Sequence, residues 1–171
     1  MKEFYNEILD EVIEITAAQY GAFVAFDIQG HPDSFVAQGL SDEHVGKLVD
    51  FSIDGGLLKS GLQEISVLRV DNINEDRGLQ LLASGNSSVK TLFVQTLRID
   101  EVTRGIIYLT NRKGGEPFTG SDEFILNMVT KDVVHVLQRN RLIKVLKDDI
   151  ELREHGQSEL GKASKEVPNH G

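Results

Sequence analysis

Apolar residues near the N-terminus recur at the spacing of an amphipathic helix. Four of them lie three or four positions apart, with acidic residues between them: Phe4, Ile8, Val12 and Ile15. This period places apolar side chains on one side of a helix. We therefore predict a helix over residues 2–18 that stops at Tyr20-Gly21.

Short apolar runs bounded by turn residues follow this helix and predict strands. They cover five ranges: 22–28, 34–40, 65–70, 89–99 and 102–110. A turn cluster at residues 29–33 joins the first two runs, and Asp100-Glu101 joins the last two, so each pair predicts a hairpin. Residues 71–88 are polar and irregular, and a connection of this length inside a domain is usually functional.

Two further helices are indicated by their N-terminal signals. Ser41 precedes an acidic pair in the pattern of a helix N-cap. Ser121 is expected to cap a long helix over residues 122–154, whereas residues 156–171 lack apolar periodicity and predict a disordered tail. The order of elements describes an α+β fold. Its central antiparallel sheet would have about five to six strands, with long N- and C-terminal helices packed on one face.

Composition narrows the class of protein. The 171 residues, 40% of them apolar, are enough for one domain with a helical extension. Lys and Arg total 18 against 27 Asp and Glu, a formal charge of −9, which disfavours nucleic acid and anionic membranes as partners. The N-terminus mixes charges with its apolar residues, unlike a signal peptide or a spanning helix, so we expect a cytoplasmic protein.

The candidate chemistry gives no support for an enzyme. The chain has no cysteine, which excludes disulfides, thiol catalysis and Cys-ligated metals. Its serines lack the context of a nucleophile elbow, and its five histidines show no metal-binding spacing. His44, beside Asp42 and Glu43, is expected on a polar helix surface. We expect a non-enzymatic protein without a metal site.

Several short motifs occur in an order and spacing that resembles GAF domains, the small sensory modules of signalling proteins. They are Tyr20-Gly21-Ala22, Gly39-Leu40-Ser41-Asp42-Glu43, Gly55-Gly56-Leu57-Leu58, Leu68-Arg69-Val70-Asp71-Asn72-Ile73 and Tyr108-Leu109-Thr110-Asn111-Arg112-Lys113-Gly114-Gly115. The similarity is closest to the GAF domains of haem-type dormancy sensor histidine kinases. It implies a GAF sensory domain over residues 1–145 that includes both terminal helices, and a helix extension over residues 146–155.

The haem-binding subgroup differs from this chain at one position. Its proximal histidine stands before the central strand that begins here near Val89, and the matching residue is Asn86. Asparagine cannot supply the imidazole nitrogen that holds haem iron. The distal tyrosine of the subgroup is matched by Tyr108, so haem-based gas or redox sensing would need another histidine, such as His44. Covalent bilin attachment and methionine-sulfoxide reduction, two other functions of the family, require the cysteine that this chain lacks.

The resemblance implies a small-molecule pocket between the sheet and the loops that cover it. We expect Leu57, Leu58, Phe93 and Tyr108 to form its walls, with Asn86 and Ser88 as polar contacts. Such pockets are largely apolar with a few convergent polar groups. A filled core without a ligand is the alternative, and it would leave a module for dimerisation or docking.

One charged motif is interpreted as structural. The residues Asn111-Arg112-Lys113, Phe118 and Asp122-Glu123 resemble a signature of cyclic-nucleotide-binding GAF domains. Arg112 or Lys113 at a strand end can also pair with Asp122 at a helix start and hold the turn between them. We favour this structural role over a contact to a nucleotide.

The predicted C-terminal helix carries an apolar stripe with a seven-residue repeat. Its members are Val129, Val136, Ile143 and Ile150, with Leu146 at the intermediate position. A second stripe consists of Leu142, Val145 and Leu152. The first stripe suits a short coiled coil or a bundle with the first helix. Asp132, Arg139 and Arg153 interrupt it. We therefore expect a homodimer whose long helix transmits a signal to a histidine kinase or another signalling protein.

Overall fold

The computed structural model describes residues 1–53, 66–75, 77, 79, 89–100 and 102–165, with the side chains of residues 48–53 and 163–165 outside the description. Its helices are α1 (Lys2–Thr16), α2 (Asp42–Ile53), the short 3-10 helix η1 (Ile73–Glu75) and α5 (Gly120–Lys165). Its strands are β1 (Ala18–Phe26), β2 (Pro32–Gln38), β3 (Val67–Val70), β4 (Leu92–Ile99) and β5 (Val102–Arg112). The chain divides into a compact unit of residues 1–131 and a helical unit from residue 132 onward.

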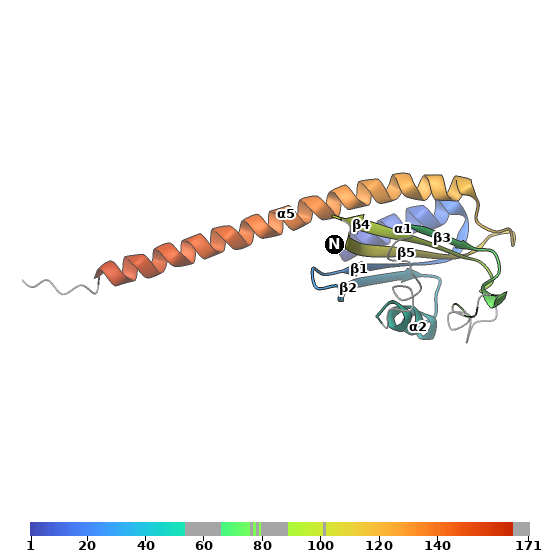
Figure 1. Cartoon of the computed structure of the whole chain (residues 1–171), viewed down its shortest axis with the longest axis horizontal. Helices are drawn as coiled ribbons and strands as arrows, with labels where there is room; N and C mark the ends of the chain where they lie inside the picture. The colour runs from blue at the N-terminus through green and yellow to red at the C-terminus, as the bar shows by residue number, and fades with distance from the viewer. Residues whose placement is uncertain (54–65, 76, 78, 80–88, 101, 166–171) are drawn as a thin grey trace, which may run out of the picture. The chain divides into compact units, whose positions relative to one another are not determined.

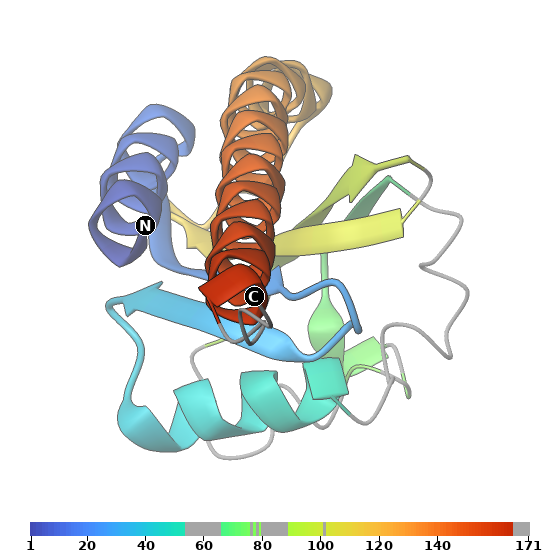
Figure 2. The ribbon, with the colours of Figure 1, turned by 90° about the vertical axis from the view of Figure 1, so that its left-hand side faces the viewer.

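The strands form one antiparallel sheet in the order β2-β1-β5-β4-β3, which confirms the predicted α+β fold (Figure 1). Both predicted hairpins are present, as β1–β2 and β4–β5. Figures 1 and 2 show α1 on one face of the sheet and α2 on the other. Because both faces are covered, the central strands are apolar on both sides, and β1 carries five consecutive buried residues over 21–25.

The end of α1 differs from its predicted position. Ala17 adopts the left-handed conformation, with φ 55° and ψ 31°, and its N–H donates to the carbonyl of Glu14. This cap turns the chain, so β1 begins at Ala18 and the predicted stop at Tyr20-Gly21 is wrong. Left-handed caps usually carry glycine, so an alanine at this position does not mark the end of a helix in the sequence.

One face of the sheet, here called the α1 face, presents Phe23, Phe93, Gln95, Ile107 and Leu109, which the strand register places on the same side. The ring of Tyr5 in α1 stacks on Phe23 with centroids 4.6 Å apart. Phe93 meets the edge of Phe118, which precedes α5, at 5.8 Å. Gln95 Nε2 donates to Asn127 Oδ1 at 3.0 Å. The α1 face is therefore closed by α1 and the first turns of α5.

The other face, here called the Tyr108 face, presents Ala22, Val24, Val94, Ile106 and Tyr108. Figure 2 shows α2 on this side of the sheet. The buried residues Ile73 and Leu79 belong to the same apolar cluster. Residues 71–88, expected to be irregular, thus contain η1 and contribute to the core in the part that the structure describes.

The long helix begins and ends at other residues than predicted. Glu123 N–H donates to the carbonyl of Thr119, which makes Thr119 and not Ser121 the N-cap. Asp122 Oδ2 in turn accepts the Thr119 N–H at 2.8 Å and its hydroxyl at 3.2 Å, an arrangement related to the capping box.

The helix continues to Lys165, so the expected disordered tail is wrong for residues 156–165. Apolar periodicity is needed only where a helix packs against a neighbour, so its absence does not mark the end of this helix. Residues 166–171 lie outside the described residues. None of the described helices is apolar over a length sufficient to cross a membrane.

Candidate functional site

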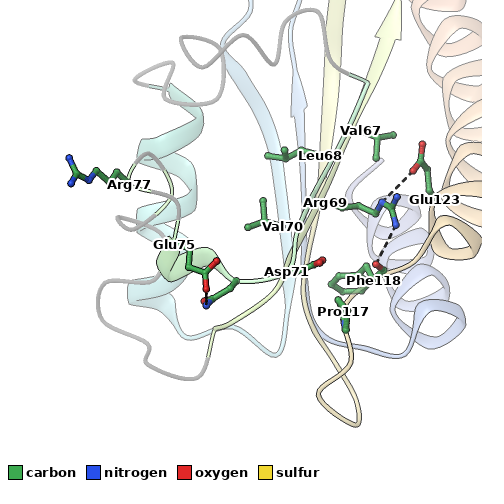
Figure 3. A pocket seen from close by; sticks show the side chains of 11 residues that line it. Val67, Leu68, Arg69, Val70, Asp71, Glu75, Arg77, Pro117, Phe118 and Glu123 are labelled. Carbon is green, nitrogen blue, oxygen red and sulfur yellow. Dashed lines mark hydrogen bonds and ion pairs between the residues drawn. The ribbon is translucent and has the colours of Figure 1, made fainter.

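The first turn of α5 is attached to two strands of the sheet by ion pairs. Arg112 at the end of β5 lies 3.7 Å from Asp122 Oδ2, which confirms the predicted pairing. Arg69 of β3 lies with its Nε 3.5 Å from Glu123 Oε2, and its Nη1 donates to the carbonyl of Phe118 at 3.5 Å (Figure 3). Asp122 is buried, so its contacts are shielded from solvent more than those of Glu123. Both strands therefore hold the start of the helix.

A groove of about 960 Å³ runs along the edge strand β3 (Figure 3). Leu68 and Val70 point to one side of the strand and pack against the apolar cluster of the Tyr108 face. Arg69 points to the other side, towards Phe118 and Glu123. Side chains alternate along the four residues of β3, so this one strand contributes side chains to both faces of the sheet.

The predicted pocket residues do not share one wall. Phe93 pairs with Leu109, and Val94 pairs with Tyr108, so Phe93 and Tyr108 point to opposite faces. The expectation that both line one pocket is wrong, because Phe93 packs against Phe118 on the α1 face. The other expected contacts, Leu57, Leu58, Asn86 and Ser88, lie outside the described residues.

Tyr108 belongs to the buried apolar cluster on its face of the sheet. It is 1% exposed and belongs to a cluster with alanine and β-branched neighbours, among them Ala22, Val24 and Val94. Two residues further along β5, Thr110 points to the same face by strand alternation. The Thr110 hydroxyl is buried and finds no hydrogen-bond partner in the part of the chain that the structure describes. This face is therefore apolar with a few hydroxyl groups.

His44 differs from its predicted surface position, because only 3% of the residue is exposed. Burial lowers the pKa of its imidazole, Lys47 lowers it further, and Glu43 acts in the opposite direction. Within the described ranges it is the one buried histidine. Polar neighbours in the sequence do not reveal which side of a helix a residue occupies. For this reason the sequence analysis placed His44 on the surface.

The described residues offer a poor fit to haem. The five strands carry no histidine, so the sheet itself presents no imidazole for haem iron on the Tyr108 face. The buried imidazole of His44 comes from α2 instead. No group of three side chains suited to a metal ion occurs among the residues that the structure describes.

Arg69 and Thr110 are the residues whose roles the sequence did not indicate. Arg69 stands in a motif of the GAF resemblance, but its contacts to Phe118 and Glu123 join segments that are distant in the chain. Arg69 and Phe93 are cross-strand partners and lie on the same face of the sheet. Side-chain alternation along β3 is the signal that could have indicated this position. Nothing in the sequence indicates that the Thr110 hydroxyl has no partner among the described residues.

Comparisons with known proteins identify the fold. No protein-family model matches the sequence. A domain described as part of a two-component sensor histidine kinase from Sinorhizobium meliloti 1021 is 16% identical, with 81% of this chain and 91% of that chain covered and a TM-score of 0.60. The GAF domain/HD domain protein from Geobacter sulfurreducens is 14% identical, with 80% and 91% covered and a TM-score of 0.62.

An enzyme also shares the architecture. The type II free methionine-R-sulfoxide reductase from Thermoplasma acidophilum is 14% identical, with 81% of this chain and 95% of that chain covered and a TM-score of 0.55. At these identities the likeness concerns the fold alone. The five-stranded sheet with its terminal helices is the fold of GAF domains, as the sequence motifs predict.

Proposed function

We propose that this protein is a sensory GAF domain of a signal-transduction system. A small molecule would bind on the Tyr108 face, and α5 would transmit the bound state to a histidine kinase or another signalling partner. One observation carries this proposal: the edge strand β3 contributes Leu68 and Val70 to the apolar cluster and Arg69 to the attachment of α5. We also retain the expectation of a cytoplasmic, non-enzymatic protein.

The character of the Tyr108 face indicates the class of ligand. Its cluster is made of aliphatic side chains around Tyr108, and Tyr108 and Thr110 add hydroxyl groups. A binding surface of this kind favours a largely apolar molecule with one or two polar groups. The −9 charge of the chain further disfavours polyanionic ligands.

Transmission would follow from the geometry of β3. A ligand that displaces Leu68 or Val70 moves the backbone between them, and Arg69 shares that backbone. The contacts of Arg69 to Glu123 and Phe118 are both 3.5 Å, at the long end of such interactions, so a small displacement breaks them. The first turn of α5 would then lose one of its two attachments.

Ligand binding is tested by native mass spectrometry of freshly purified protein, followed by thermal-shift measurements with the molecule found or with a panel of nucleotides and metabolites. Tyr108→Phe removes one hydroxyl from the proposed site and should reduce the ligand-induced shift. Tyr5→Phe removes a hydroxyl from the α1 face and serves as the matched control, because Tyr5 is also buried. No bound mass and no shift across the panel would favour a ligand-free docking module.

Transmission is tested by hydrogen exchange of the first turns of α5. Arg69→Gln removes both contacts to the helix start and should speed exchange there. Arg77→Gln is the control, because Arg77 lines the same groove but points away from α5 in Figure 3. Equal exchange in the two variants would separate β3 from the helix and remove the basis of the transmission route.

Haem-based sensing is a second candidate, favoured only by the buried His44. Its lowered pKa keeps the imidazole neutral, the form that binds iron. Absorption spectra of protein purified after haem supplementation test it. A Soret band that disappears in His44→Ala would support haem, whereas the absence of the band leaves the small-molecule proposal in place.

A homodimer is the assembly that we propose. Most of the apolar residues of the predicted stripes are exposed on α5, as expected of a helix surface that packs against another chain. Light scattering at high micromolar concentration tests it, with an expected mass of twice 19.0 kDa. A mass of 19.0 kDa would contradict the dimer and leave the sensory role untouched.

A further inference from the structure

The second half of α5 exposes apolar side chains around a wide sector of its surface. Seven large ones are more than 40% exposed: Leu142, Ile143, Val145, Leu146, Ile150, Leu152 and Leu160. A helix of this character is marginal alone in water, because its stability normally comes from packing an apolar side against a neighbour. The surface therefore needs a partner helix.

The charges of this part of α5 are separated into two blocks. Residues 135–147 contain four basic side chains and no acidic one. Residues 148–159 contain five acidic side chains and one basic one, Arg153, which pairs with Asp149 at 3.1 Å. A second copy in the same direction would place like blocks together, whereas a second copy in the opposite direction would place each block against its complement.

The apolar repeat leads to the same orientation. Arg139, Leu146, Arg153 and Leu160 follow one another at intervals of seven along the stripe. In a parallel pair in register, identical positions of the stripe face each other, so Arg139 would meet Arg139 and Arg153 would meet Arg153. In an antiparallel pair the positions in the repeat of Ile143 face the positions in the repeat of Leu146. Neither arginine then meets its own copy.

We infer that the second half of α5 binds α5 of a second copy of this chain in the antiparallel direction, centred on Asp148. Leu146 then lies opposite Ile150 of the second copy, and Ile143 lies opposite Arg153 of the second copy. The basic block of each helix covers the acidic block of the other. This orientation rests on the proposed homodimer and adds its geometry.

The absence of cysteine makes disulfide trapping a clean test. Ile143→Cys and Arg153→Cys are prepared in differently tagged chains, co-refolded as full-length protein and oxidised. The antiparallel pair brings these two positions together, so the mixed product should dominate. Each variant alone should cross-link little, because identical positions are then ten residues apart, about 15 Å along the helix, beyond the reach of a disulfide.

A parallel dimer gives the opposite pattern, since identical positions face each other. Strong self-cross-linking of Ile143→Cys and of Arg153→Cys, with little mixed product, would therefore overturn the orientation while the homodimer stands. A monomeric mass for the unmodified chain, or a helix captured only by a different protein, would overturn the homodimer itself.

A charge placed in the seam tests the same surface without cross-linking. Leu146→Lys should raise the dimer dissociation constant at least about tenfold, because it puts a cation into the apolar contact. Ser158→Lys adds the same charge at a position beside the seam and should leave the dimer intact. Equal dissociation in the two variants would show that the stripe is not the contact and would refute the inference.

Discussion

The two faces of the sheet are built from the same strands but differ in how they are completed. The α1 face is filled by aromatic rings from outside the sheet, with Tyr5 on Phe23 and Phe118 on Phe93. The Tyr108 face presents aliphatic residues and a hydroxyl at Thr110 that has no partner among the described residues, and α2, which carries the buried His44, covers it. The first face is therefore completed by aromatic rings, and the second carries polar groups among its apolar side chains.

Both faces are tightly packed, because the apolar cluster of the Tyr108 face is itself buried. The difference therefore concerns which side chains complete each face. Strand β3 belongs to both faces, because Leu68 and Arg69 are neighbours that point in opposite directions. Under the proposed transmission route, a change on the Tyr108 face would reach the start of α5 through this strand.

The largest effect is expected from the α1 face. Phe93→Ala removes a fully buried ring and should lower the free energy of unfolding by about 3–5 kcal/mol in urea titrations. Val70→Ala on the half-buried rim of the Tyr108 face should cost about 1 kcal/mol. Equal losses would contradict the expectation that the buried volume removed at each position sets the cost.

A smaller effect is expected at the start of α5. Asp122→Ala removes the carboxylate that accepts two hydrogen bonds from Thr119 and pairs with Arg112, and it should cost about 2 kcal/mol. Glu116→Ala removes an exposed carboxylate nearby and should change stability by less than about 0.5 kcal/mol. The comparison is made by chemical denaturation at constant pH and salt. A loss as small as that of Glu116→Ala would show that the cap and the ion pair do not hold the helix.

The pH dependence of stability should report on His44. Its pKa is lowered in the folded state, so the unfolded state binds the proton first as the pH falls. The contribution of His44 is complete above its unfolded pKa of about 6.5 and is lost as the pH falls towards the lower folded value. Thermal unfolding between neutral and mildly acidic pH should show this loss in the unmodified chain and in His155→Gln, whose histidine is exposed. His44→Gln should flatten the curve, and an unchanged curve would refute the assignment.

The smallest effect separates two buried threonines. Thr110→Val replaces a hydroxyl without a described partner and should leave stability unchanged or raise it by up to about 1 kcal/mol. Thr130→Val removes a hydroxyl that donates to the carbonyl of Asn127 at 3.2 Å and should lower stability by about 1 kcal/mol. Paired calorimetric measurements decide the sign. A clear destabilisation by Thr110→Val would show that its hydroxyl is already satisfied and is not kept for a ligand.

The reach of the sequence analysis is clearest at the start of α5. The pairing of Arg112 with Asp122 was predictable, because a strand end and the helix that follows it are close in the chain. The contacts of Arg69 to Phe118 and Glu123 were not, because only the pairing of β3 with β4 brings them together. The Thr119 cap was missed for a different reason, since Ser121 two positions later offers the same capping chemistry.

The candidate site was harder to predict than the fold. Both Phe93 and Tyr108 were expected to form walls of one pocket, but their faces depend on the register between β4 and β5. A shift of one residue reverses every side chain of a strand, and periodicity alone does not fix the partner strand. His44 was likewise assigned to the surface, although α2 buries it.

The amino-acid sequence by itself determined the order of helices and strands, the α+β class and the absence of cysteine chemistry. These properties follow from local spacing and composition, which act within a few residues of each other. Only the tertiary structure decided which face each aromatic residue occupies, which strand reaches the start of α5 and which histidine is buried. Those properties depend on strand register and on packing between distant segments, because a side chain's environment is made by its neighbours in space.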